Sequence, residues 1–232
     1  MARHVSFDPR CSRCQLKVPL CMCAELVPVK TRTQVVILMH AQEAAKPTNT
    51  GRIAAACLSS SQLRLYANRE GPVPERPWAP GTRPALLFPA PGARSLESLR
   101  GGQPVTLLVP DGTWRQAMRL RRRLVSTGEV PFVALPEGPA SSYRLRSGTR
   151  TDSLSTGEAI ARALGVLEGE VVQRHLERAL AVFTERTLWM RGAIETEHVT
   201  GGIPSGVSRH GPLGATPSAE VLTSSESAEP FA

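Results

Sequence analysis

The chain has 232 residues, 41% of them apolar and 21% charged, and its formal net charge is +8. This composition is typical of a globular protein with one domain and appendages, and no run approaches the roughly 18 apolar residues that a membrane helix requires. Residues 1–30 contain no apolar signal segment, so we expect a cytoplasmic protein with no membrane partner. The positive charge favours a nucleic-acid partner, although the arginine-rich composition of a GC-rich genome gives the same balance.

From Thr33 onward, short apolar runs alternate with segments of helical spacing. The runs of strand length are 34–39, 63–66, 85–88, 105–109 and 132–135. The expected helices are 48–58, 95–100, 114–124, 155–167 and 171–190. This alternation predicts an α/β fold around a mainly parallel sheet. Ligands of such sheets bind beyond the carboxyl ends of the strands, which places His40, Asp111 and the segment from Pro89 to Gly92 on one rim.

Composition divides the chain into three parts. Residues 1–30 form a polar leader that contains four cysteines, and residues 31–196 contain the expected strands and helices. Residues 197–232 consist mainly of Gly, Pro, Ser and Thr with scattered charge. Such a segment cannot bury enough apolar surface to offset its ordering entropy, so we predict a leader, one catalytic domain and a disordered tail.

The leader cysteines fall close together, in the spacing C-x2-C-x6-C-x-C. They are Cys11, Cys14, Cys21 and Cys23. Four thiolates so close in a reducing compartment predict a tetrahedral metal site, and zinc is the metal we expect. With sulfur at all four positions, the zinc would be structural. An iron–sulfur cluster and two disulfides are the alternatives. Cys57 lies in an apolar helical run, which is typical of a core thiol rather than a nucleophile.

Three further segments carry polar residues that a plain α/β core does not need. They are 40–51, 110–114 and 143–159. Each has a purely structural interpretation. His40 can be a hydrogen-bonded residue at a strand end, Asp111 can cap the following basic helix, and Ser155 with Glu158 has the spacing of a capping box. Three such segments at the ligand-binding rim of one sheet nevertheless favour a functional site.

These segments resemble the motifs of the DTW-domain family. Asp111–Trp114 matches its D-x-T-W signature, residues 40–50 match a second motif, H-x-x-E-x-x-K-x-x-N-T, and residues 155–159 match a third, S-T-x-E-A. The leader cysteines match the usual amino-terminal pattern of the family. Together the motifs cover about residues 10–190 in the family's order. Ala41 stands where the family often has Pro, and Gly157 where it often has Leu, which puts fine geometry in doubt more than chemistry.

The resemblance implies a SPOUT-like fold, in which helices cover both faces of the sheet and the carboxy-terminal part forms a trefoil knot. It also implies transfer of the 3-amino-3-carboxypropyl group of S-adenosylmethionine to N3 of a tRNA uridine, with release of methylthioadenosine. A SPOUT-type RNA methyltransferase and a non-catalytic, zinc-bearing RNA-binding module are the alternatives. Both a monomer and a homodimer are compatible with the sequence.

The resemblance also suggests roles for individual residues. We expect Asp111 to act as the general base or to orient N3, together with Thr113 and Trp114, and burial beside Trp114 to raise the pKa of Asp111. At the donor, Arg144 or Arg146 would bind the carboxylate and Glu158 the ammonium. The residues expected around the adenosine are Pro89, Gly92, Leu154, Ser155 and Thr156. Those expected to contact tRNA are His40, Glu43, Lys46, Asn49, Thr50, Arg115, Arg119 and Arg122; for the arginines the alternative is a solvated helix face.

Overall fold

A computed structural model describes residues 9–67, 76–125, 130–146 and 153–209. Its centre is a six-stranded sheet with the strand order β2-β1-β5-β3-β6-β4, in which every pairing is parallel. The strands are β1 (Gln34–His40), β2 (Ser61–Tyr66), β3 (Arg83–Leu87), β4 (Arg94–Ser95), β5 (Val105–Asp111) and β6 (Phe132–Ala134). The predicted α/β fold with a parallel sheet is confirmed.

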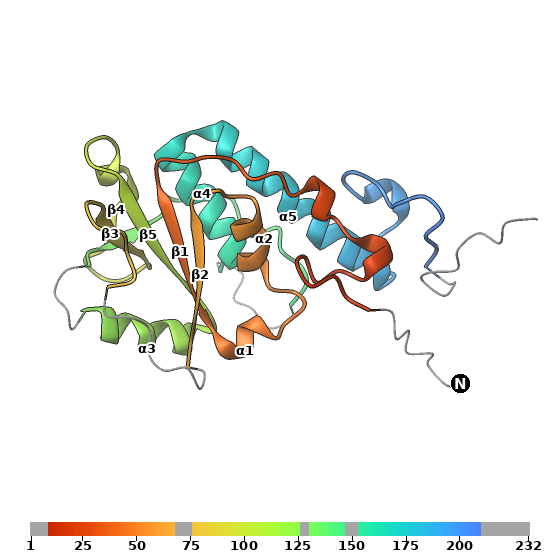
Figure 1. The fold of residues 1–232 in the computed structure, drawn as a ribbon, viewed down its shortest axis with the longest axis horizontal. Coiled ribbons are helices and arrows are strands. Elements are labelled where there is room, and N and C mark those ends of the chain that lie inside the picture. Colours follow the sequence, from red (N-terminus) through yellow and green to blue (C-terminus); the bar gives the residue numbers. More distant parts are fainter. Residues whose placement is uncertain (1–8, 68–75, 126–129, 147–152, 210–232) are drawn as a thin grey trace, which may run out of the picture.

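Helices cover both faces of the sheet, as predicted (Figure 1). One face packs against α2 (Thr50–Ala56), α4 (Thr156–Glu168) and α5 (Glu170–Met190), and the other against α3 (Trp114–Val125). Side chains alternate along a strand, so Leu107 of β5 joins the first cluster and Leu108 the second. The trefoil knot implied by the resemblance stays a prediction.

One strand and one α-helix were not predicted. The strand β4 has two residues and directly precedes the 3-10 helix η3 (Leu96–Leu99), which lies within the helical segment expected at 95–100. Both residues of β4 are exposed, so no apolar alternation marks this strand. The short helix α1 (Ala41–Ala44) follows β1 directly. With four residues it is too short to show the periodicity from which a helix is recognised.

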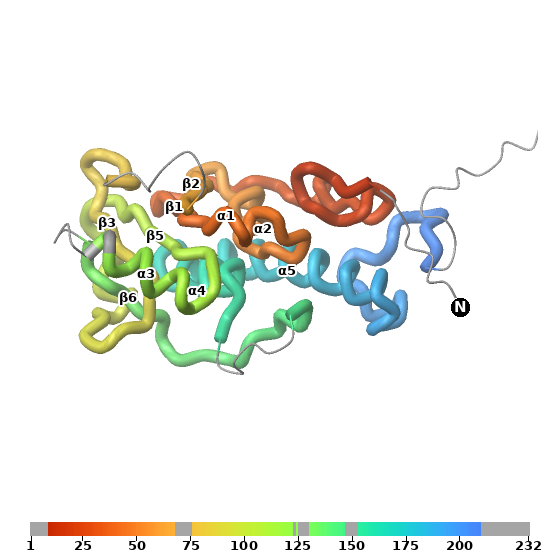
Figure 2. The backbone as a smooth tube through the Cα atoms, turned by 90° about the horizontal axis from the view of Figure 1, so that it is seen from below, coloured from red at the N-terminus to blue at the C-terminus, as the bar shows by residue number. Residues whose placement is uncertain are grey.

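The leader packs on the part of the chain that contains the sheet and does not form a separate unit. It contains the 3-10 helices η1 (Val18–Leu20) and η2 (Cys23–Glu25), and Leu16 and Leu20 are buried in the same apolar cluster as Phe183 of α5. In two perpendicular views the leader lies beside the carboxy-terminal half of α5 (Figures 1 and 2). Arg186 of α5 fastens it there. Its guanidinium donates to the carbonyl oxygens of Leu20 and Cys21 and pairs with Glu25 at 2.6 Å.

The folded part extends past the predicted start of the tail. After α5 comes the 3-10 helix η4 (Thr196–His198), and Val199 is buried against the main cluster. Arg209 donates to the carbonyl of Ile194 at 2.6 Å and lies over the ring of Trp189. The remainder of the predicted tail, 210–232, lies outside the described residues. None of the helices in the described ranges has the length and apolarity needed to cross a bilayer.

The connections of the sheet diverge between β1 and β5. From β1 the chain passes through α1 and α2 to β2, the neighbour of β1 on one side. From β5 it passes through α3, on the opposite face, to β6 on the other side. Ligands of parallel sheets bind where two such connections diverge, outside the carboxyl ends of the strands. Asp111 is the last residue of β5, and it therefore lies where the topology predicts the binding crevice.

Candidate active site and metal centre

Asp111 is a buried carboxylate that two helices hold in place. It points to the same face of the sheet as Leu107 and Val109, and its exposed fraction is 4%. Its Oδ2 accepts a hydrogen bond from Nδ2 of Asn49, and its Oδ1 accepts one from Oγ1 of Thr156, both at 2.7 Å. Asn49 caps α2, and Thr156 is the first residue of α4. The first turns of two helices thus fix both oxygens of one carboxylate.

Burial raises the pKa of Asp111, because a charge is disfavoured away from water. The hydrogen bonds from Asn49 and Thr156 oppose this rise, since they stabilise the charged form. The direction of the shift in the pKa of Asp111 agrees with the prediction, but the predicted source of its burial is wrong. Trp114 is 60% exposed and stacks on Phe88 beneath α3, with ring centroids 4.8 Å apart. Asp111 is buried by α2 and α4, on the other face of the sheet.

Asp111 does not cap the basic helix α3, which was its structural alternative. Thr113 precedes that helix, and its Oγ1 accepts a hydrogen bond from the backbone N–H of Gln116 at 3.4 Å. The Gln116 side chain in turn accepts from the backbone N–H of Thr113 at 2.7 Å. This reciprocal pair has the pattern of a capping box. The carboxylate of Asp111 therefore bonds to Asn49 and Thr156 and takes no part in capping α3.

Two glycines allow the close approach of α2 and α4. A Cβ atom at Gly51 would lie 2.7 Å from Oδ2 of Asp111, so a larger residue would displace that carboxylate. At Gly157 a Cβ atom would lie 2.6 Å from Leu180 and 3.0 Å from Thr50, and the Gly157 N–H donates to Oγ1 of Thr50 at 3.1 Å. The departure from the family pattern at Gly157 therefore accompanies a direct contact between the two helices.

A second carboxylate near the crevice, Glu43, is paired with two cations. Its exposed fraction is 1%, and it binds the Lys46 ammonium and Nη2 of Arg146, the latter at 2.8 Å. Burial raises the pKa of Glu43, but the two cations outweigh this effect and hold it below its usual value. Sequence reasoning assigned Glu43 and Lys46 to tRNA and Arg146 to the donor. The structure brings all three together and leaves Nε of Arg146 buried with no partner among the described residues.

Arg52 is a residue of the site that sequence reasoning missed. Its Nη2 donates to the carbonyl of Ala44 at 2.7 Å, while Nη1 is buried with no partner in the described part of the chain. Burial lowers the pKa of Arg52, and the charge of Asp111 acts in the opposite direction. A signal was present, since Arg52 is the one charged residue in the segment 48–58, which is otherwise uncharged.

The capping box predicted at Ser155 and Glu158 is confirmed, and it also anchors a loop. Besides the N–H of Ser155, the Glu158 carboxylate accepts hydrogen bonds from Ser141, Ser142 and the N–H of Tyr143. Burial raises the pKa of Glu158, but these donors outweigh it and hold the pKa below its usual value. The role of Glu158 toward the donor ammonium stays a prediction. Both oxygens of this carboxylate already accept hydrogen bonds from other groups of the chain.

A small pocket of about 190 Å³ lies between this loop, α4 and α5. Residues of the predicted motifs that line it are Thr50, Tyr143, Arg144, Ser155 and Glu158, and α5 contributes Leu180, Ala181, Thr184 and Glu185. Ligand pockets usually measure about 300–1,000 Å³, so this pocket matches only part of a nucleoside donor. The half-buried Leu154 adjoins Ser155, whereas Pro89 and Gly92 are exposed beyond β3.

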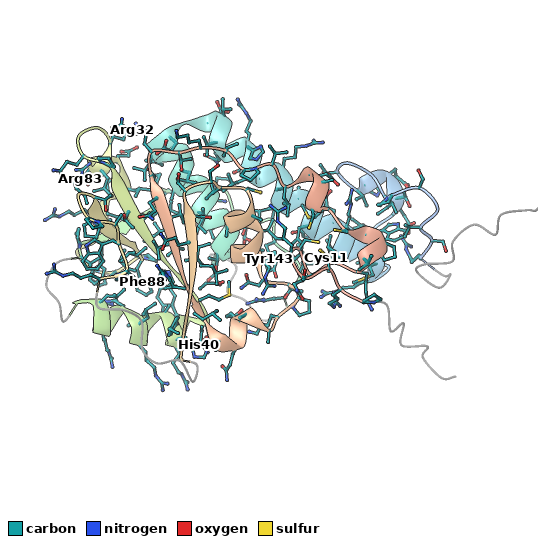
Figure 3. The ribbon with its side chains drawn as sticks, in the orientation of Figure 1. Cys11, Arg32, His40, Arg83, Phe88 and Tyr143 are labelled. Carbon is teal, nitrogen blue, oxygen red and sulfur yellow. The ribbon has the colours of Figure 1, made fainter. Side chains whose placement is uncertain are left out.

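His40 lies away from Asp111, although both end neighbouring strands. The residue of β1 opposite Asp111 is Met39, so His40 points to the other face, where its ring meets the edge of Tyr66 at 5.2 Å. Its Nδ1 caps α1 by accepting from the N–H of Gln42 at 3.2 Å. Figure 3 shows His40 at the lower end of the sheet, apart from Tyr143. The structure thus supports the structural interpretation of His40.

The remaining residues that we assigned to tRNA lie on α3. Arg115, Arg119 and Arg122 are exposed there, at the spacing of one helix face. Their helix covers the face of the sheet opposite to Asp111. The residues of the predicted site therefore lie on both faces of the sheet, at the edge formed by the carboxyl ends of its strands.

The four leader cysteines have the arrangement of a metal site. Their sulfur atoms all lie within 4.8 Å of one another, with 3.5 Å between Cys11 and Cys23 and 3.8 Å between Cys14 and Cys21. Tetrahedral zinc–sulfur bonds would place sulfurs about 3.8 Å apart. All of these cysteines are free thiols, which argues against two disulfides. Cys57 is buried in the core, as predicted, and burial raises the pKa of its thiol to about 11.

Comparison with known proteins agrees with the motifs. The DTW domain matches residues 8–188. A tRNA-uridine aminocarboxypropyltransferase 2 of Macaca fascicularis is 30% identical over 184 residues, which cover 74% of this chain and 61% of that protein. The protein of that name from Mus musculus is 28% identical over 187 residues (76% and 63%), and that from Drosophila melanogaster 27% over 177 residues (71% and 70%).

The chain spans less than two thirds of the length of the two mammalian relatives. No solved structure matches it. The DTW domain nevertheless covers well over half of the chain, from the leader cysteines to the last turn of α5. The chain therefore belongs to the DTW-domain family.

Proposed function

We propose that the protein transfers the 3-amino-3-carboxypropyl group of S-adenosylmethionine to N3 of a tRNA uridine. The observation that carries this proposal is Asp111, a buried carboxylate with a raised pKa at the crevice of the sheet. Three relatives bear the name of this activity. N3 of uridine carries a proton and is a poor nucleophile until the proton leaves, and a buried carboxylate suits that task.

In the proposed step, Asp111 takes the N3 proton while the N3 electron pair forms a bond to the γ-carbon of the donor. The bond between that carbon and the sulfonium sulfur breaks, and its electrons leave with neutral methylthioadenosine. Asn49 and Thr156 keep the carboxylate in one orientation through their hydrogen bonds. Such positioning favours attack on the γ-carbon over attack on the methyl group, because the two carbons lie in different directions from the sulfur.

Two guanidinium groups near Asp111 suit the carboxylate of the donor. Nε of Arg146 and Nη1 of Arg52 are buried donors without acceptors in the described residues, and a buried unpaired donor is costly unless a ligand completes it. Arg144 lines the adjoining pocket together with Ser155. We propose that this pocket receives one end of the donor, with Leu154 and Thr156 beside the adenosine and Pro89 and Gly92 at its outer side.

The test uses purified protein, unmodified tRNA and S-adenosylmethionine, followed by digestion and mass spectrometry of the nucleosides. We expect a uridine heavier by one aminocarboxypropyl group, and released methylthioadenosine. A methyl increment would instead establish an RNA methyltransferase. An unchanged RNA that still binds the protein would support a non-catalytic RNA-binding module.

We also propose that Cys11, Cys14, Cys21 and Cys23 hold a structural zinc ion. The sulfur distances fit the metal, and Arg186 ties the leader to α5 next to pocket-lining Glu185. Purified protein should contain one zinc per chain by elemental analysis. The Cys14→Ser variant should lose the metal and unfold at lower temperature, whereas the Cys57→Ala control keeps the metal. Bound iron with visible absorption would show an iron–sulfur cluster instead.

A further inference from the structure

Trp114 presents a large aromatic surface to solvent. It is the first residue of α3 and is 60% exposed, although indole is among the side chains that gain most from burial. One face of the ring is held, since it stacks on Phe88 at 4.8 Å and 25°. Phe88 itself is 3% exposed, and the guanidinium of Arg121 lies over its ring at 5.8 Å. Trp114 is therefore an oriented ring on a rigid support.

Trp114 does not contribute to the burial of Asp111, because α2 and α4 cover that carboxylate. Its surroundings are basic. Arg115, Arg119 and Arg122 follow it on the same helix, exposed and at the spacing of one face. Such a stripe suits the phosphates of a nucleic-acid strand, and aromatic rings beside a basic groove are how proteins hold unpaired bases.

The location of the ring also fits the proposed reaction. The choice of RNA as the ligand of this surface rests on that proposed function. Trp114 lies three residues after Asp111, at the carboxyl edge of β5. N3 is on the pairing edge of uridine, so the reacting nucleotide must be unpaired, and unpaired RNA bases are bound by stacking on aromatic side chains. We propose that Trp114 stacks on an unpaired base of the RNA substrate, with Phe88 supporting the opposite face of its ring.

The proposal separates base contacts from phosphate contacts, and two probes measure them. One is an oligouridylate of eight nucleotides, and the other is an abasic oligomer with the same number of phosphates. Trp114→Ala should bind oligouridylate about tenfold more weakly and the abasic oligomer as tightly as the wild type. Trp114→Phe should recover most of the loss. The control Arg119→Gln should weaken binding of both probes alike.

Intrinsic fluorescence provides a second measurement. Oligouridylate should quench the wild-type protein, and the quenching should disappear in Trp114→Phe, which keeps Trp78 and Trp189. The proposal is overturned if Trp114→Ala binds oligouridylate like the wild type, if it loses both probes equally, or if the wild type does not distinguish the probes. Circular dichroism and a melting curve show whether each variant is folded.

These measurements need no S-adenosylmethionine, so their outcome does not depend on whether the proposed reaction takes place. Base-dependent binding through Trp114 in a protein that modifies no tRNA would support the stacking site and contradict the transferase. If the protein modifies tRNA but the Trp114→Ala variant binds oligouridylate like the wild type, the transferase is supported and the stacking site is contradicted.

Discussion

The two ends of the segment Asp111–Trp114 lie in opposite environments. Asp111 is 4% exposed with both oxygens hydrogen-bonded, whereas Trp114 is 60% exposed and begins a basic helix on the other face of the sheet. The strand directs Asp111 inward, and Gly112 and Thr113 turn the chain into α3. Four consecutive residues thus supply both a desolvated carboxylate and a solvent-facing ring.

Under the proposed function, the difference in environment separates the chemical step at Asp111 from the attachment of RNA at α3. Electrostatic interactions at Asp111 are strong because water is excluded, whereas those of exposed arginines on α3 are screened by salt. Changes on the Asp111 side should therefore alter the rate with little effect on RNA affinity. Changes on the α3 side should do the opposite.

The sharpest test of this separation is Asp111→Asn. Removing the base should lower the rate of transfer by at least about 100-fold, while tRNA affinity stays within about twofold of the wild type. Single-turnover assays and filter binding measure the two quantities. Glu97→Gln, an exposed carboxylate in η3, is the matched control and should change neither. Retained transfer in Asp111→Asn would rule out the base.

The pH dependence of transfer sharpens the interpretation of Asp111. Because the ionised form is the base, the rate should rise about tenfold per pH unit until the pKa is passed, and then level off. Burial raises that pKa, so the inflection should lie above the usual range for aspartate. Thr156→Val removes a hydrogen bond to the charged form and should move the inflection to still higher pH. An unmoved inflection would contradict the assignment.

Gly51→Ala tests whether the carboxylate must occupy its observed place. The added Cβ would lie 2.7 Å from Oδ2 of Asp111, so the carboxylate must shift. We expect transfer to fall about tenfold, since small displacements of reacting groups are costly. In the Asp111→Asn background the same change should have little further effect on the rate. A full additional loss in the double variant would show that Gly51 acts elsewhere.

The smallest effect is expected from single arginines of α3. Arg119→Gln should weaken tRNA binding a few fold, irrespective of sequence, and lower the slope of log affinity against log salt by about one. The rate of transfer at saturating tRNA should not change. If the saturated rate changed and the salt slope did not, Arg119 would affect the chemical step, and the separation of roles between the two faces would be contradicted.

Much of the fold was readable from the sequence because its signals are local. The buried runs of β1 and β5 predicted strands, the spacing of Ser155 and Glu158 predicted a helix start, and the cysteines predicted a metal site. The five predicted strands are within two residues of their observed bounds. A capping box or a strand of apolar residues depends on few distant contacts, which is why such predictions succeed.

The distribution of residues between the two faces was not readable in this way. His40 and Asp111 end neighbouring strands, but the pairing of Met39 with Asp111 puts His40 on the opposite face. That register depends on tertiary structure. The same holds for Trp114, whose direction depends on the face that α3 covers, and for Arg52, whose hydrogen-bond partner is the carbonyl of Ala44 in another helix.

The attachment of the leader to α5 has a consequence for the order of synthesis. Arg186 contacts the carbonyl of Leu20 across 166 positions of the chain. At about 5–20 residues per second, a ribosome needs roughly 10 to 30 seconds between making these two residues. During that interval Leu16 and Leu20 have no α5 to pack against, and the leader cysteines on either side of them are exposed to oxidants. The leader therefore reaches its final surroundings only after α5, which is made later, has emerged.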